Sequence, residues 1–166
     1  MEFIQHTINW VRGEILESVV FGAFGFITLI ISIIFWRFGK TPNAKGMIIP
    51  LLVIGLFYFI AGAVNIYRNQ QRIPQYQEEY QKNPVGFIES EKNRTEGFMN
   101  IYIYTYVIGT VMILTGLILF LFVGGANPKG IGLSLILMGL SLLCIDYFSK
   151  ERAISYHNEI VEFLHK

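Results

Sequence analysis

Four long runs without a charged residue are the feature of this sequence that most constrains its fold. They cover residues 18–36, 46–67, 97–128 and 130–145. A helix needs roughly 20 residues to cross the hydrocarbon core of a bilayer, which is about 30 Å thick. Each run is long enough or nearly so, and none shows the apolar–polar alternation of a barrel strand. The sequence therefore predicts an all-α integral membrane protein with a four-helix bundle of transmembrane spans.

The composition agrees with this class of protein. Hydrophobic residues make up 53% of the 166 residues and charged residues 15%, whereas a soluble domain has about 25% charged residues. We expect a single membrane domain, with spans at about 18–36, 47–67, 99–123 and 130–148. The net charge of +1 gives no reason to expect a nucleic-acid partner, so the lipid bilayer is the first partner that the sequence implies.

The N-terminal segment, residues 1–17, carries apolar residues on one helical face. Ile4, Ile8, Val11 and Ile15 have this spacing, and the nearby Trp10 is a residue type that favours the membrane interface. The pattern predicts an amphipathic interfacial helix on the membrane surface, with Gly13 marking the bend into the first span.

Three of the four predicted spans continue as helices beyond the bilayer. Residues 68–98 are predicted to form a projecting helical hairpin, in which Pro74 kinks or interrupts the first arm. Asn83 and Pro84 suit the start of the second arm, which should run on to about residue 123. Residues 149–166 are predicted to form an amphipathic C-terminal helix that packs on the hairpin. Helices 2, 3 and 4 would thus extend as a three-helix cytoplasmic bundle.

The distribution of basic residues predicts the orientation of the chain. The N-terminal segment, the hairpin and the tail carry nine of the 13 basic residues, and the two short loops carry four. The positive-inside rule then places both termini in the cytoplasm of a cell with this protein in its inner membrane. The first short loop is itself densely basic, which is the observation that speaks against this orientation.

Small residues recur at seven-residue spacing in every span. Seven residues make two helical turns, so each pair lines one face, and close approach through small residues is a main source of helix association in lipid. We expect left-handed helix packing at these positions. The pairs are Gly25 and Ser32, Gly55 and Gly62, Gly109 and Gly116, and Gly132 and Gly139.

Polar residues gather at the predicted cytoplasmic boundary of the spans. Asp146 follows the small-residue face of the fourth span, and we expect it to pair with Arg68 or Arg94. Asn65 and Asn100 should lie at a similar depth and hydrogen-bond across the hairpin, since buried polar groups need partners. The alternative is that all five residues are solvated helix ends.

The sequence carries no pattern typical of an enzyme. Its one cysteine, Cys144, cannot form an internal disulfide or a thiolate zinc site, and His6, His157 and His165 lie at the chain ends without metal-ligand spacing. We therefore expect a non-enzymatic protein without a cofactor or a bound metal.

Two functional classes remain open. The first is a membrane protein that binds a protein partner or itself through its cytoplasmic helices or its spans, such as an immunity, assembly or regulatory protein. Five aromatic residues of the hairpin and tail are candidate anchors, or else the core of the projection: Tyr76, Tyr80, Phe87, Tyr156 and Phe163. The alternative is an oligomeric channel or small-solute transporter, for which Thr105, Thr110 and Thr115 could line a path, although no span has an ionisable residue in its interior.

Two stretches resemble known sequences. KNPVGFIESEKNRTEGFMNIY, residues 82–102, and KGIGLSLILMGLSLLCIDYFSKERAISYH, residues 129–157, are similar to small, uncharacterised four-helix membrane proteins of bacteria. In these proteins an acidic and basic stretch leads into the third span, and an aspartate followed by charged residues closes the fourth. The resemblance implies an architecture and no activity.

Overall fold

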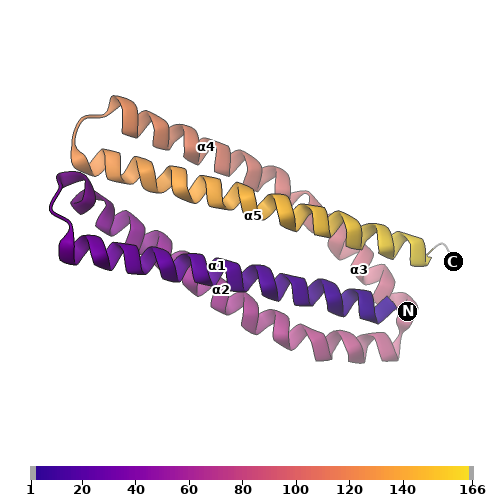
Figure 1. The fold of residues 1–166 in the computed structure, drawn as a ribbon. Helices are drawn as coiled ribbons and strands as arrows, with labels where there is room; N and C mark the ends of the chain where they lie inside the picture. The colour runs from indigo at the N-terminus through magenta and orange to yellow at the C-terminus, as the bar shows by residue number, and fades with distance from the viewer. Residues whose placement is uncertain (1–2, 165–166) are drawn as a thin grey trace.

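The structure, a computed structural model, describes residues 3–164, and all regular secondary structure within them is helical. These residues form α1 (Phe3–Phe38), α2 (Pro42–Lys82), α3 (Pro84–Met99), α4 (Ile101–Phe122) and α5 (Ala126–Leu164), and no strand (Figure 1). Four helical stretches are long and apolar enough to cross a membrane, with α3 and α4 together making the third. The all-α prediction is confirmed, and the four stretches indicate a multi-pass membrane protein. The last two residues of the predicted tail 149–166, including His165, lie outside the described part.

Local sequence signals set the helix boundaries. Thr41 caps α2 by accepting a hydrogen bond from the Ala44 amide at 3.2 Å, and Asn83 caps α3 by accepting one from the Gly86 amide at 3.0 Å. A proline follows each cap, at a position where its missing N–H costs nothing. Gly125 has a φ of 101° in the turn before α5, a conformation that glycine adopts without strain.

The long helices are interrupted at different places from those expected. α2 continues through Pro74 as one helix, so Pro74 does not end the first arm of the hairpin. The third long helix, expected to be continuous, is divided at Asn100 into α3 and α4. Gly97 and Asn100 both have low helix propensity, and the Asn100 side chain does not cap α4.

Each hairpin is held together by small residues. All eight residues of the seven-residue pairs are buried. A Cβ on Gly25 would lie 2.8 Å from the Gly55 carbonyl oxygen, so α1 and α2 approach backbone to backbone. In the same way, a Cβ on Gly116 would lie 2.6 Å from the Gly132 carbonyl oxygen, between α4 and α5. Ser32 adds a hydrogen bond to the Ile48 carbonyl oxygen at 2.8 Å.

The two hairpins meet through α5 and do not close into a four-helix bundle. Figure 1 shows the α1–α2 and α4–α5 hairpins, with both termini at the same end. Among the described helices, α4 contacts α3 and α5 but neither α1 nor α2. α2 contacts α5, and the Tyr58 hydroxyl lies 2.8 Å from the Ser141 hydroxyl. The expected four-helix bundle is therefore open, because each of α1 and α4 has only one face of small residues.

The end of the molecule that holds the termini is a four-helix bundle, the polar-end bundle, built from parts of α1, α2, α3 and α5. Its core contains Phe3, Trp10, Val11, Phe87, Tyr156 and Ile160. The prediction of a three-helix bundle with a separate interfacial helix over residues 1–17 was wrong in this respect. α1 passes through Gly13 without interruption, and the Arg152 guanidinium occupies the space where a side chain at Gly13 would lie. An amphipathic pattern alone does not distinguish a face covered by lipid from one covered by protein.

The glycine contacts lead to a test of hairpin packing. Gly25→Ala should lower the free energy of unfolding by about 1–3 kcal/mol, because the new methyl group meets the backbone of α2. Gly22→Ala, three residues away on the same helix, has nothing within 4 Å of the added Cβ and should be neutral or stabilising. Thermal unfolding of both variants in mild detergent makes the comparison. Equal melting temperatures would show that backbone contact at Gly25 does not hold the hairpin.

Candidate functional site

A cavity of about 590 Å³ lies where the polar-end bundle meets the apolar parts of the helices. We call it the junction cavity. Residues of all five described helices line this cavity. α4 has no contact with α1 or α2, and this separation leaves space beside α5. Its lining residues are Trp10, Glu14, Asn65, Arg72, Arg94, Phe98, Ile101, Tyr102, Thr105 and Asp146. The cavity thus combines two acidic and two basic residues with aromatic rings.

The junction cavity brings together three of the five polar residues expected to form a cluster. Asn65, Arg94 and Asp146 line it, whereas Arg68 and Asn100 are exposed side chains outside its lining. The predicted pairing of Asp146 with an arginine is not what the structure shows, because Arg94 binds Glu91 and the ion pairs of the described residues do not include Arg68. The expected hydrogen bond between Asn65 and Asn100 is also not formed within residues 3–164, where both side chains are exposed.

Asp146 and Glu14 are the two carboxylates of the cavity that the protein does not neutralise directly. The Oδ2 atom of Asp146 is buried and has no hydrogen-bond partner among residues 3–164. Burial raises the pKa of the Glu14 carboxyl above its usual value, and the neighbouring Glu17 raises it further. The positive charges of Arg152, Arg94 and Arg72 oppose this rise in pKa. A buried polar atom without a partner is uncommon in a native protein and marks a place where a ligand or partner can bind.

Directly beside the cavity, a buried network joins α1, α3 and α5. Arg94 donates two hydrogen bonds to Glu91, at 2.7 and 2.6 Å, and its guanidinium lies 4.5 Å from the centre of the Trp10 ring. Because a carboxylate only accepts, the Tyr156 hydroxyl donates to Glu91 at 2.8 Å. The Tyr156 oxygen then accepts from Thr7 at 2.9 Å. Burial raises the pKa of the Tyr156 phenol, so this group stays protonated as the network requires.

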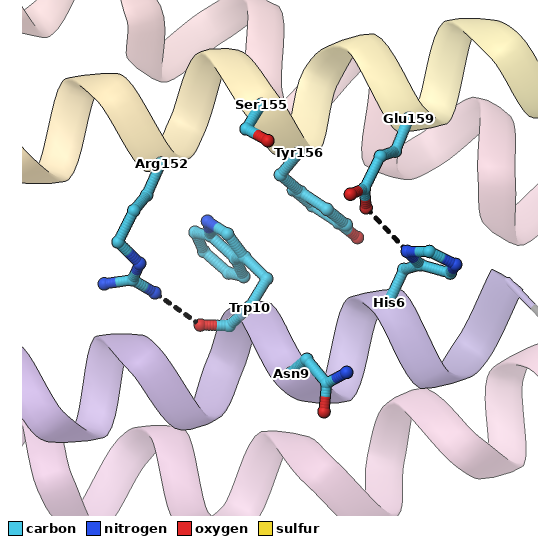
Figure 2. A pocket seen from close by; sticks show the side chains of 7 residues that line it. All are labelled: His6, Asn9, Trp10, Arg152, Ser155, Tyr156 and Glu159. Atoms are coloured by element: carbon cyan, nitrogen blue, oxygen red, sulfur yellow. Dashed lines mark hydrogen bonds and ion pairs between the residues drawn. The ribbon is translucent and has the colours of Figure 1, made fainter.

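A second, smaller cavity of about 230 Å³ lies between α1 and α5 and is bounded by polar contacts (Figure 2). Arg152 donates to the Trp10 carbonyl oxygen at 2.9 Å and forms an ion pair with Glu17. His6 lies 2.8 Å from the Glu159 carboxylate at the other side of this cavity. These contacts fasten the two hairpins together at the polar end.

Sequence reasoning missed Glu14, Arg72 and Glu91. It named Trp10 and Tyr156, but did not place either beside the cavity. A signal was present in α3, where Glu91 and Thr95 follow Phe87 at intervals of four residues and therefore share its buried face. A glutamate on a buried face predicts a buried partner. For Trp10 and Glu14 no such signal exists, because their neighbours come from distant parts of the chain.

The site offers charged, polar and aromatic side chains as binding groups. Within residues 3–164, no group of three His, Cys, Asp or Glu side chains could hold a metal ion. Comparison with known proteins adds no family to this geometry, since no protein-family description, curated protein or solved structure matches the chain. The similarity to small bacterial four-helix proteins therefore stays an expectation.

The buried network predicts which acidic residue matters for stability. Glu91→Ala should lower the free energy of unfolding by about 3 kcal/mol, because Arg94 would be left largely buried without its partner. Glu96→Ala is the matched control on α3, since Glu96 is half exposed and lies 3.9 Å from Lys92; its loss should cost less than about 1 kcal/mol. The measurement is unfolding of both variants in mild detergent. Equal stability of the two variants would contradict the importance of Glu91 for the stability of the fold.

The environment of Glu14 predicts a pH-dependent stability. The folded state holds the Glu14 proton more tightly than the unfolded state, so the contribution to stability is present below the ordinary pKa of 4.5 and is lost as the pH rises through the folded-state value. Glu14→Gln should therefore raise the melting temperature at pH 7.5 and change it little at pH 4.5. Glu17→Gln, which breaks the ion pair with Arg152, should lower it at pH 7.5. A lower melting temperature for Glu14→Gln at pH 7.5 would show that the carboxylate is stabilised by the fold.

Proposed function

We propose that this chain is a non-enzymatic membrane protein that acts by binding a partner protein, and that the partner binds at the junction cavity. One observation carries the proposal: Asp146 and Glu14 line the same cavity, and neither carboxylate forms an ion pair among residues 3–164. Burying a carboxylate without a charged partner is costly, so such a group is a candidate for binding one. A lysine or arginine side chain of a partner helix has the charge that complements these two carboxylates.

The aromatic residues of the polar-end bundle are poorer candidates for contacting a partner than the residues of the junction cavity. Tyr76, Tyr80, Phe87, Tyr156 and Phe163 all belong to the core cluster or pack against it. Of the two interpretations of these residues, the structure supports the core. A partner is therefore expected to use the open space beside α5, where the apolar helices present many exposed side chains.

The orientation proposed with this function places both termini in the cytoplasm of a cell whose inner membrane holds the protein. It is supported by the sequence distribution of the basic residues, since the N-terminal segment, the hairpin and the tail carry nine of them and the two short loops carry four. Alkaline phosphatase, which is active only outside the cytoplasm, should be active when inserted at Gly124 and inactive when fused after Leu164. The reverse pattern would place the polar-end bundle outside the cytoplasm.

The cavity itself gives the test of partner binding. Asn65 is an exposed residue that lines the cavity, so Asn65→Trp should fill the space and abolish capture of a stoichiometric partner from native membranes in mild detergent. Asp146→Asn should weaken capture by removing the charge alone. Val64→Trp is the control, because Val64 is exposed beside Asn65 but does not line the cavity.

Two results would argue against the proposal. Capture that survives both Asn65→Trp and Asp146→Asn would place the partner elsewhere on the molecule. If the intact protein captures nothing and carries an ion or solute flux in liposomes, the alternative function as an oligomeric channel or small-solute transporter subunit takes precedence. Removal of the tail would be a poorer test, because Tyr156 and Ile160 belong to the core of the polar-end bundle.

A further inference from the structure

A mainly apolar groove lies at the opposite end of the molecule, between α2 and α5. It has a volume of about 470 Å³, within the range of about 300–1,000 Å³ that is typical of ligand sites. We call it the loop-end groove. Its polar end contains Lys45 and Asn127, and its apolar part contains Val53, Ile54 and Met138.

The mouth of the groove is positively charged and has no acidic counterpart. The two short loops carry Arg37, Lys40, Lys45 and Lys129, and no acidic residue occurs from 18 to 77 or from 97 to 145. The ion pairs formed among residues 3–164 include none of these four. α2 and α5 both begin here, so their free amide groups and positive dipole ends add to the potential.

A buried hydroxyl group inside the groove lacks a partner. Ser134 is 2% exposed, lines the groove, and its Oγ atom has no hydrogen-bond partner within the described part of the chain. It lies seven residues after Asn127, which is about 10 Å further along α5. A buried hydroxyl is stabilised by a hydrogen bond that the protein here does not supply, so a ligand in the groove should present an acceptor at this depth.

We propose that the loop-end groove binds one anionic diacyl phospholipid. The phosphate lies at Lys45, Asn127 and the two helix N-termini, an ester carbonyl oxygen accepts a hydrogen bond from Ser134, and an acyl chain lies along Val53, Ile54 and Met138. The order of charge, hydroxyl and apolar surface along the groove is the order of phosphate, ester and acyl chain in such a lipid. The site is separate from the junction cavity and does not depend on the partner proposed there.

The test is native mass spectrometry of the full chain in mild detergent, with phosphatidylglycerol or phosphatidylcholine of the same acyl chains. One phosphatidylglycerol should be retained, and phosphatidylcholine should be lost at the same activation energy. Lys45→Gln should reduce retention about fivefold, whereas Lys40→Gln, which removes an exposed lysine of the same loop outside the groove, should not. Equal retention of the two lipids, or equal effects of the two lysine variants, would overturn the proposal.

Two further variants separate lipid binding from damage to the fold. Val53→Trp should block the groove, and Leu52→Trp should not, because both residues are exposed on α2 and only Val53 lines the groove. Ser134→Ala should keep or raise the melting temperature of the lipid-free protein, since it removes an unpaired hydroxyl, yet lower lipid retention. Retention unchanged by Val53→Trp, or a dimer in which a second copy fills the groove, would overturn the proposal.

Discussion

Close backbone contact at small residues is the constraint on which the rest of this structure depends. Lipid provides little hydrophobic drive for helices to associate, so the helices need faces that allow their backbones to approach. Gly25 with Gly55, and Gly116 with Gly132, supply such contacts within each hairpin. α4 has one face of this kind, and that face packs against α5. The hairpins therefore join only along α5, and the space left beside it is the junction cavity.

The polar-end bundle is held together by different interactions, because its helices bury charged groups as well as apolar ones. Glu91 is 2% exposed and is tolerated there because Arg94 and Tyr156 satisfy its oxygens. Arg152 fastens α5 to α1 through Glu17 and a backbone carbonyl. These groups are occupied in holding the bundle together. Glu14 and Asp146, which form no ion pair among residues 3–164, line the junction cavity, and this contrast is why the cavity is the better candidate for function.

Much of the architecture could be predicted from local patterns. The uncharged runs indicated the four long helices, Asn83 and Pro84 indicated the start of α3, and the seven-residue spacing indicated all eight buried small residues. The candidate site was predicted less well. Asn65, Arg94 and Asp146 line one cavity, but Asp146 lacks the predicted arginine partner. Depth along a helix can be counted in residues, whereas the direction of a side chain toward another helix depends on how the helices are rotated.

The sequence by itself determined that the chain is helical, that a helix begins at Asn83 and Pro84, and that four stretches are apolar enough to cross a membrane. These properties follow from propensity, capping and composition, which act over a few residues. Only the tertiary structure decided that α1 completes the polar-end bundle, that the apolar helices form an open arrangement around α5, and that Glu91 rather than Asp146 pairs with Arg94. An amphipathic face or a charged side chain can be satisfied by several neighbours of similar free energy, and the choice among them is made when all helices pack at once.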